Sequence, residues 1–503
     1  MPTFLLHLSG ELSLKSKDVR QRFTDRLVHN LADALRSELG KGHATIRRSW
    51  SRVYVDSKTD EAGVIAARIF GVKAVAKAER RPWRTVDDLL DHGAELFAPA
   101  VAGRTFAVRV KRGEQASRLP FRSPEVERQL GARLIDGARG VDLRSPEVEA
   151  WIELHGEEAY FFARPMAADG GLPVGTGGRA LCLISGGFDS AVAAWAMLRR
   201  GVRLDYVFCN LGGDAHVAEV LRVAKVLADR WSYGYRPRLH LVDFRPVIEN
   251  LRASTEPSYW QLVLKRRMLC VAEGLARPSK AVALVTGEAI AQVASQTLHN
   301  LSAVDAACRR PILRPLLAWN KEDILALARH IGTYDASASV PEYCGLEARR
   351  PETHATPDAL DEQEARTDDA LLRRLLDERT VLDLRAYEPD RQVTPDLVVD
   401  AVPDGATLLD LRPAGAFRSW HPDGARHAPY PEILDTFRTL DQDADYVAVC
   451  EIGLKSAQLV ERMVAAGYRA ATVGRGIATL RKAQQRDPAL DALLSPAVRD
   501  DRG

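Results

Sequence analysis

The stretch RALCLISGGFDSAVAAWAMLRRG, residues 179–201, decides the fold of the central part of the chain. An apolar run typical of a buried strand leads into two adjacent glycines and then into a segment typical of a helix. Gly186 and Gly187 carry no side chains, so backbone N–H groups can approach phosphate oxygens beside the positive end of the helix. Ser185 and Ser190 add hydroxyl donors. The stretch therefore predicts a strand–loop–helix unit that binds the phosphates of a nucleotide.

The strand–loop–helix pattern repeats through residues 175–345, which predicts a doubly wound parallel sheet with helices on both faces. In such sheets the ligand lies at the C-terminal ends of the strands. A second apolar strand ends near Gly287, and Asn320 is expected to cap a helix that begins with Lys321. A lysine in the first turn opposes the helix dipole unless an anion is nearby, so Lys321 is either a phosphate ligand or an exposed surface lysine.

Residues 1–60 and 61–166 are expected to form two α+β units. Apolar residues recur every fourth position from Val19 to Leu35, which predicts a helix that stops at Gly40. Basic residues gather at 101–128, with seven Lys or Arg against three acids. Such a cluster is either a phosphate-contacting surface or a solvated charged face.

The last third of the chain divides into an acidic segment and a further α/β unit. Residues 346–400 show little apolar periodicity and are expected to be a linker with a mobile start, and residues 401–490 form the unit. In VAVCEIGLKSA, residues 447–457, Cys450 follows an apolar strand and precedes a helix. The helix N-terminus and Lys455 would favour a reactive thiolate, and the alternative is a buried core cysteine.

Composition limits the class of protein. The chain has 503 residues, 46% of them hydrophobic and 27% charged, with a net charge of +2, so three to four ordinary globular domains are expected. Six cysteines without a CxxC pair argue against a structural zinc site or a disulfide scaffold, and no metal ligands are predicted. No apolar run approaches the roughly 20 residues that span a bilayer. A cytoplasmic location without a membrane partner is therefore expected.

Several motifs together carry a resemblance to a known family. SGGFDS resembles the PP-loop enzymes, which cleave ATP between the α- and β-phosphates and adenylate a carbonyl oxygen. SGGFDS, FCNLGG, LVTGEAIAQVASQTLHNL, RPLLAWNKEDI and PEYCG occur in the order and spacing of the tRNA 4-thiouridine synthetases, also called thiamine biosynthesis sulfurtransferases. GELSLKS and FAVRVKR look like the N-terminal regions of that family. LDLRPAGAFRSWHPDGARHAPY, Cys450 and GRG resemble the rhodanese domain that one branch of it carries.

The resemblance implies a fold for each part of the chain. Residues 1–60 would be a ferredoxin-like domain and residues 61–166 a THUMP domain. Residues 175–345 would be a PP-loop adenylation domain with a doubly wound parallel sheet. An acidic linker at 346–400 would lead to a rhodanese-like α/β domain at 401–490.

The resemblance also implies an ATP-dependent activity on tRNA. The family adenylates the uridine at position 8 and replaces its oxygen with sulfur, using ATP and Mg²⁺. Asp189 would assist adenylation, and the following residues would line the ATP site: Leu183, Ile184, Ser185, Gly186, Gly187, Ser190, Lys265, Gly287, Gln296 and Lys321. The tRNA would contact Arg109, Lys111 and Arg112.

For the sulfur step, the resemblance implies a persulfide on Cys450 that a cysteine desulfurase loads. Cys344 would resolve the product as a disulfide with Cys450, and a reductant would reopen that disulfide. Many rhodaneses carry arginine where this chain has Lys455, which puts bidentate anion binding there in question. The family also supplies sulfur for the thiamine thiazole, and a homodimer is compatible with it.

Three alternatives stay open from the sequence. Another PP-loop tRNA thiolase or ATP-dependent ligase would share SGGFDS, although it gives no reason for both the N-terminal and the C-terminal units. A rhodanese-type sulfur carrier would have lost adenylation activity. A non-catalytic RNA-binding adaptor would use neither site.

Overall fold

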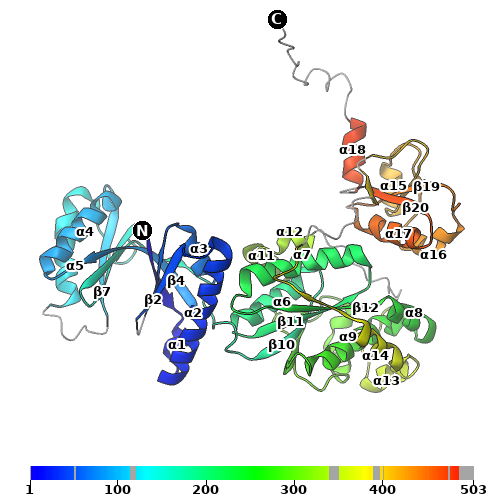
Figure 1. The fold of residues 1–503 in the computed structure, drawn as a ribbon, viewed down its shortest axis with the longest axis horizontal. Helices are drawn as coiled ribbons and strands as arrows, with labels where there is room; N and C mark the ends of the chain where they lie inside the picture. Colours follow the sequence, from blue (N-terminus) through cyan, green and yellow to red (C-terminus); the bar gives the residue numbers. More distant parts are fainter. Residues whose placement is uncertain are drawn as a thin grey trace, which may run out of the picture. The chain divides into compact units, whose positions relative to one another are not determined.

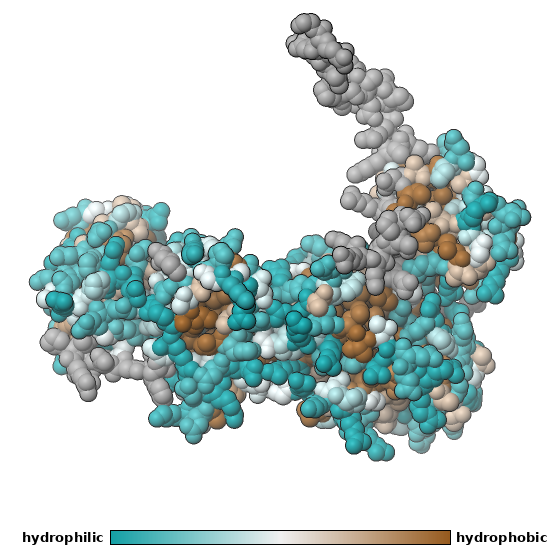
Figure 2. All heavy atoms as spheres, in the orientation of Figure 1, coloured by the Kyte–Doolittle hydropathy of each residue, from teal (hydrophilic) through white to brown (hydrophobic). Residues whose placement is uncertain are grey.

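The computed structural model places most of the chain (Figure 1). It describes residues 2–49, 52–113, 121–338, 350–388, 397–399, 401–451, 453–473 and 476–485. The chain forms two compact units. The first comprises Met1–Arg179, Trp195–Leu204 and Ala228–Arg236, and the second comprises Ala180–Ala194, Asp205–Leu227 and Pro237–Gly503. In the described part of the chain, no helix is both long enough and apolar enough to cross a bilayer. Figure 2 shows a mostly hydrophilic outer face with smaller apolar areas.

One nine-stranded sheet runs through both predicted N-terminal domains. Its strands are β1 (Thr3–Leu8), β2 (Ala44–Arg48), β3 (Val53–Ser57), β4 (Val72–Pro82), β5 (Thr105–Arg112), β6 (Gly140–Val141), β7 (Val148–His155), β8 (Glu158–Phe162) and β9 (Met166–Ala167). The order is β2-β3-β1-β4-β8-β7-β5-β6, with β9 beside β4. The eleven-residue β4 pairs with β1 through its first half and with β8 through its last four residues. This one long strand therefore joins the two halves.

Helices cover the sheet over two separate cores. The helices are α1 (Gly10–Ser13), α2 (Lys17–Leu39), α3 (Glu61–Ala67), α4 (Val86–Val101) and α5 (Ser123–Leu134). The predicted apolar series forms the buried face of α2, where Leu27 and Leu31 pack against Ala62 and Ile65 of α3 in one core. A domain boundary was expected between residues 60 and 61. Because α3 packs in the first core, that core extends past this boundary. A second core lies under α4 and α5.

The first unit also includes two segments from the middle of the chain. Trp195 and Trp231 both pack on Phe70, with ring centroids 5.5 Å and 5.6 Å from it. The side-chain amide of Asn30 on α2 donates to the carbonyl oxygen of Val174 at 3.0 Å. These contacts fix the connecting segment around residues 170–178 against α2.

The central domain is built on a six-stranded sheet. Its strands are β10 (Arg179–Leu183), β11 (Arg203–Asn210), β12 (Arg238–Asp243), β13 (Ala283–Val285), β14 (Ile312–Leu313) and β15 (Thr380–Asp383), in the order β14-β13-β10-β11-β12-β15. The pairs β10–β13, β11–β12 and β13–β14 are parallel. Its helices are α6 (Phe188–Arg199), α7 (Asp214–Trp231), α8 (Arg245–Ser254), α9 (Trp260–Ala276), α10 (Leu298–Asp305), α11 (Lys321–Ile331) and α12 (Tyr334–Ala338). The predicted α/β sheet is confirmed.

Residues 350–388 differ from the predicted acidic linker. They form α13 (Pro357–Glu364), α14 (Asp369–Glu378) and β15, and β15 pairs antiparallel with the edge of β12. Leu360, Leu371 and Leu375 belong to the core of the central domain. The segment has an amphipathic pattern: its leucines enter the core, and the carboxylate of Glu364, which is 16% exposed, pairs with arginines on α9.

The C-terminal domain holds a five-stranded sheet in the order β16-β20-β19-β17-β18, with parallel pairs throughout. Its strands are β16 (Val398–Val399), β17 (Thr407–Asp410), β18 (Arg426–His427), β19 (Asp445–Val449) and β20 (Arg469–Val473). Its helices are α15 (Ala414–Ser419), α16 (Ile433–Thr436), α17 (Leu454–Ala465) and α18 (Ile477–Gln485). Two cores pack on this sheet. Cys450 directly follows β19 and precedes α17.

Candidate functional site

The loop between β10 and α6 is shaped by its own serines. The Oγ atom of Ser190 accepts a hydrogen bond from the Ser185 N–H at 3.1 Å and lies 3.2 Å from the Gly187 carbonyl oxygen. The Gly187 N–H donates to the Ser185 hydroxyl at 3.3 Å. Ser190 is buried, so its hydroxyl stabilises the loop from inside. The loop thus stays open for phosphate oxygens at the start of α6.

Gly287 lies against this loop at the end of β13. A Cβ atom at Gly287 would lie 2.6 Å from both the carbonyl carbon of Asp189 and the nitrogen of Ser190. Real Cβ atoms essentially never come so close to backbone. The glycine therefore lets the end of β13 contact the first turn of α6, and its contribution to the site is close packing.

Asp189 meets two residues from distant segments. Its carboxylate accepts hydrogen bonds from Lys321 Nζ at 2.7 Å and from Gln292 Nε2 at 2.9 Å. Lys321 begins α11, with Asn320 at the N-cap as predicted. The Lys321 ammonium also lies 5.8 Å from the ring centroid of Phe188. The structure thus brings the predicted Asp189 and Lys321 together and adds Gln292, which was not among the predicted site residues.

Lys265 belongs to a second charged group of the central domain. Its ammonium lies 2.8 Å from Oε1 of Glu288, and the Arg314 guanidinium lies 2.8 Å from Oε2 of the same carboxylate. Burial by itself would raise the pKa of Glu288, but Lys265 and Arg314 outweigh burial and hold it below its ordinary value. Glu288 therefore stays ionised and fixes the lysine in place.

Three further residues predicted to line the ATP site, Leu183, Ile184 and Gln296, have different hydrogen-bond partners in the structure. The Ile184 N–H donates to the Val207 carbonyl at 2.9 Å inside the sheet. Leu183 ends β10 and is half-buried. The Oε1 atom of Gln296 is buried and has no partner among the described residues, so it is ready to accept a hydrogen bond from an amino group. An open glycine loop and two nearby lysines suit the phosphates of a nucleotide.

A metal site is less defined than the nucleotide site. Within the described ranges, no three His, Cys, Asp or Glu side chains are grouped to hold a metal ion. Asp189 is the carboxylate beside the loop, and its oxygens already contact Lys321 and Gln292. Any Mg²⁺ bound there would have phosphate and water oxygens as most of its ligands.

Cys450 is buried, 1% exposed, and belongs to a core of the C-terminal domain, while its thiol also lies inside a tight loop. Its Sγ atom accepts a hydrogen bond from the Gly453 N–H at 3.2 Å, and the Ser456 hydroxyl donates to it at 3.5 Å. Gly453 has φ +93°, and a Cβ on Gly476 would lie 2.6 Å from the Cys450 carbonyl oxygen. These donors face the sulfur at the N-terminus of α17, where a negative sulfur is stabilised.

Lys455 occupies the position at which an arginine was expected. Its ammonium lies 5.1 Å from the centroid of the Tyr430 ring. The Tyr430 hydroxyl donates to Oε1 of Gln458 at 2.9 Å. Burial raises the pKa of the Tyr430 phenol. A neutral tyrosine thus lies beneath the lysine at the start of α17.

Of the other cysteines, Cys182 and Cys209 are buried, Cys270 and Cys308 are half-buried, and Cys344 lies outside the described residues. Burial raises the pKa of Cys182 to about 12 and raises that of Cys209 further. Cys308, which donates to a carboxylate oxygen of Glu273 at 2.8 Å, also has its pKa raised to about 12, first by burial. These three thiols stay protonated near neutral pH.

The three residues predicted to contact tRNA lie on β5, where the two arginines make internal contacts. Arg109 donates to the Leu143 carbonyl at 2.6 Å, and Arg112 donates to the Phe121 carbonyl at 3.0 Å. The Lys111 side chain is exposed. Their contact with RNA stays a prediction.

Comparison with known proteins gives these sites a family. Four family models match the chain. They are the ThiI ferredoxin-like domain at residues 3–76, the THUMP domain at 84–164, the thiamine biosynthesis protein (ThiI) at 175–368 and a rhodanese-like domain at 394–477. The chain is 35% identical over 469 residues to a tRNA sulfurtransferase of Pyrobaculum aerophilum, covering 93% of this chain and 95% of that protein. It is 34% identical to one of Desulfurococcus amylolyticus, covering 96% and 98%.

Two solved structures are similar to this chain in fold. A 4-thiouridine synthetase, crystallised as an RNA complex with bound ATP, matches with a TM-score of 0.67 and 28% identity over 76% of this chain and 99% of that one. PH1313 from Pyrococcus horikoshii shares the fold, with a TM-score of 0.52 and 22% identity over 66% of this chain and all of that one. The four domain models match in this order, and the sequence similarity to the tRNA sulfurtransferase of Pyrobaculum aerophilum extends over 93% of the chain. The chain therefore belongs to the ThiI family of tRNA sulfurtransferases.

Proposed function

We propose that this chain uses ATP to convert the uridine at position 8 of tRNA into 4-thiouridine. The observation that carries the proposal is the loop around Cys450, in which the Gly453 N–H and the Ser456 hydroxyl donate to Sγ. Such donors stabilise negative charge on sulfur, which a thiolate and a persulfide both carry. The PP-loop domain in the same chain supplies the activation that a sulfur nucleophile needs at a uracil carbonyl.

In the first step, the C4 oxygen of the uridine attacks the α-phosphorus of ATP, and pyrophosphate leaves. The Gly186 and Gly187 backbone would hold the phosphates, and Lys321 and Lys265 would balance their negative charge. Asp189 orients the Lys321 ammonium, since the two are 2.7 Å apart. Mg²⁺ supplies further charge on the phosphates when it is bound with ATP.

In the second step, sulfur replaces the adenylated oxygen. A cysteine desulfurase first transfers sulfane sulfur to Cys450. The terminal sulfur attacks C4 of the adenylated uridine, the C4–O bond breaks, and AMP leaves with its electron pair. The Cys344 thiolate then attacks the Cys450 sulfur, which releases 4-thiouridine and forms a Cys344–Cys450 disulfide. A dithiol reductant returns two electrons and two protons before the next cycle.

In vitro thiolation tests the proposal directly. Unmodified tRNA, ATP, cysteine and a desulfurase are combined with the native chain or with Cys450→Ser, and 4-thiouridine is measured by mass analysis of nucleosides. We expect product from the native chain and essentially none from Cys450→Ser. The matched control is Cys270→Ser, which changes a half-buried cysteine elsewhere and should keep most of the activity. Product from Cys450→Ser at the native rate would rule the mechanism out.

Asp189→Asn separates this function from that of a plain sulfur carrier. A carrier without adenylation would load and pass on sulfur normally with this substitution and would release no AMP. Our proposal expects sulfur loading on Cys450 to persist while thiolation and AMP release fall together. Supply of sulfur for thiamine thiazole would need Cys450 but not Asp189, so the same variant tests that additional role. A homodimer is compatible with the proposal, and light scattering of the native chain decides it.

A further inference from the structure

Thr472 places a hydroxyl in an otherwise apolar part of the C-terminal domain. It lies on β20 and is 5% exposed. Its neighbour across the sheet, Ala448 on β19, belongs to the same core as Cys450, and Ala470 packs against that core two residues earlier on β20. A valine at this position would fill nearly the same space, and a hydroxyl buried there costs free energy unless it forms a hydrogen bond.

The Thr472 hydroxyl is paired with the hydroxyl of Ser456 on α17. The two oxygen atoms are 2.8 Å apart, and Ser456 is fully buried. In the part of the chain that the structure describes, the Thr472 side chain forms no other hydrogen bond. Each hydroxyl has one proton, and the Ser456 oxygen is the acceptor within reach of the Thr472 proton. Thr472 is therefore the donor of this pair and Ser456 the acceptor.

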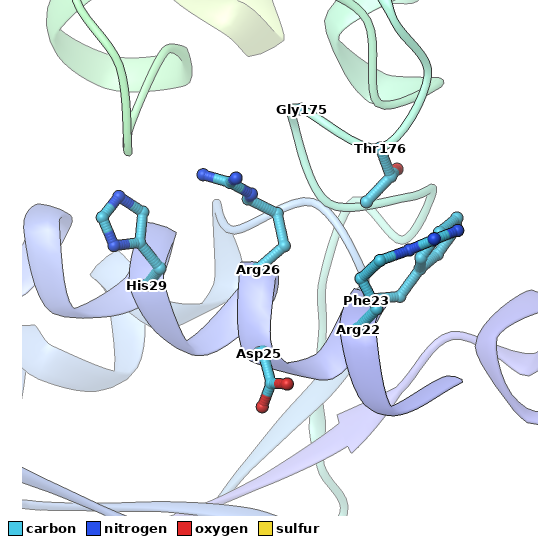
Figure 3. A pocket seen from close by; sticks show the side chains of 7 residues that line it. All are labelled: Arg22, Phe23, Asp25, Arg26, His29, Gly175 and Thr176. Carbon is cyan, nitrogen blue, oxygen red and sulfur yellow. The ribbon is translucent and has the colours of Figure 1, made fainter. Parts of the chain in front are cut away.

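Two other threonines show what a hydroxyl does when it stabilises only the local backbone. Thr176, on the loop drawn in Figure 3, donates to the Pro173 carbonyl at 2.8 Å. Thr255 donates to the Leu251 carbonyl at 2.7 Å. Both bonds hold a turn or a helix end within a few residues of the chain. Thr472 differs from them, because its hydroxyl contacts a side chain on another element.

Ser456 connects this hydroxyl pair to the sulfur of Cys450. Its Oγ atom lies 3.0 Å from the Gly453 carbonyl oxygen and 3.5 Å from the Cys450 Sγ atom, and its one proton can go to either. A neutral thiol is a weak acceptor beside a carbonyl oxygen. A negative sulfur is a strong one, because hydrogen bonds to ionised acceptors are roughly twice as strong as neutral bonds. The Ser456 proton therefore turns to the sulfur when the thiolate forms.

We propose that Thr472 is a positioning residue for sulfur uptake at Cys450, an inference that rests on the function proposed above. Because Thr472 donates to Ser456, the Ser456 proton is not spent on Thr472 and stays available for the sulfur. The first hydroxyl also polarises the second, which strengthens the bond between Ser456 and a negative sulfur. The thiolate that attacks the sulfane sulfur of a donor is stabilised in this way.

Alkylation of Cys450 by iodoacetamide tests the proposal without RNA or ATP, because the thiolate is the reacting form. The rate is measured on the full-length chain from pH 6 to pH 10 by mass analysis of the peptide that contains Cys450. Thr472→Val keeps the shape and should slow alkylation at pH 7 about threefold to tenfold. Its pH profile should move to higher pH by about 0.5 to 1 unit, so the loss should shrink at alkaline pH. Thr472→Ser keeps the hydroxyl and should keep the native profile.

Two further variants show whether Thr472 acts through Ser456. Ser456→Ala removes the hydroxyl beside the sulfur and should shift the profile at least as far. The double variant Ser456→Ala/Thr472→Val should then show no further loss. Thr407→Val is the matched control, because Thr407 pairs with Tyr446, at the opposite end of β19 from Cys450. It should leave the profile unchanged.

A native pH profile in Thr472→Val would overturn the proposal. Fully additive losses in the double variant would also overturn it, since Thr472 would then act independently of Ser456. A loss that is equal at every pH and that Thr472→Ser shares would show a purely structural role and would overturn it as well. A native chain that makes no 4-thiouridine, although its Cys450 is alkylated with the expected profiles, would contradict the proposed function and not this role of Thr472.

Discussion

At the scale of single residues, Gly287 shows how one missing side chain holds a nucleotide site together. Gly287→Ala would place a methyl group 2.6 Å from backbone atoms of Asp189 and Ser190, and backbone cannot swing aside as a side chain can. We expect ATP affinity to fall about tenfold and the free energy of unfolding to fall by roughly 1–3 kcal/mol. Calorimetric titration with ATP and urea unfolding measure the two effects.

Gly131→Ala is the control for that substitution. Gly131 lies within α5 and has open space around its Cα, so alanine there should be neutral or stabilising by about 0.5–1 kcal/mol. Native ATP affinity in Gly287→Ala would show that the end of β13 can move without disturbing the loop.

A second residue-scale prediction concerns acid sensitivity. His240 on β12 is 6% exposed, and neither ring nitrogen has a partner in the described part of the chain. Burial, with Arg379 and Arg238 nearby, lowers its pKa from 6.5 to about 4. The unfolded chain therefore binds a proton between pH 6.5 and 4 that the folded chain does not, so stability falls as the pH decreases through that window.

His240→Phe removes the titrating group and should weaken this dependence. Thermal unfolding at pH 7.5 and pH 5.0 measures it, and the drop in the midpoint should be smaller for the variant than for the native chain. His216, whose pKa burial lowers to about 3, keeps part of the acid sensitivity in both proteins. An identical pH dependence in the two proteins would mean that His240 becomes protonated without unfolding.

At the scale of secondary-structure elements, α13 and α14 are held to α9 by arginines. Arg267 is 5% exposed, lies 3.3 Å from Glu364, donates to the Glu364 carbonyl at 2.9 Å and pairs with Asp369. Without Arg267, Glu364 would keep only Arg266 as a charged partner, and the Glu364 carbonyl would lose its donor. Arg267→Ala should lower stability by roughly 3 kcal/mol and increase hydrogen exchange in residues 357–383.

Arg277→Ala is the comparison for that variant. Arg277 is the exposed C-cap residue of α9, so its loss should leave exchange in the two helices unchanged. Equal exchange in Arg267→Ala and in the native chain would show that leucine packing alone holds α13 and α14.

At the scale of the whole molecule, the end of the central domain lies beyond the end expected from the sequence. Leu360, Leu371, Leu372 and Leu375 are buried in its core. Burial of each leucine contributes roughly 1.5–3 kcal/mol to the free energy of unfolding. The four together are comparable to the roughly 5–15 kcal/mol by which a typical domain is stable.

A chain that ends after residue 388 should fold and bind ATP, whereas one that ends after residue 338 should aggregate. Gel filtration and ATP titration of the two truncated chains measure this. Equal folding of both chains would refute the extended boundary.

The sequence predicted the local chemistry because local chemistry depends on adjacent residues. SGGFDS is the turn and the helix start that directly follow β10, and the loop at Cys450 likewise lies between a strand and a helix. The four-residue period of α2 was equally local and is confirmed, and Asn320 lies at the predicted N-cap position of α11, although its side chain makes no capping hydrogen bond.

Only the tertiary structure shows which residues from distant segments form hydrogen bonds and ion pairs with one another. Asp189 and Lys321 are 132 residues apart, and Gln292 reaches the same carboxylate from 103 residues away. Residues 350–388 were predicted to be a linker because Arg266 and Arg267, with which their acids pair, lie on another helix. A sequence shows which charges a segment carries, but only packing shows which charges face one another, since a carboxylate beside water and one beside a buried guanidinium are spelled the same.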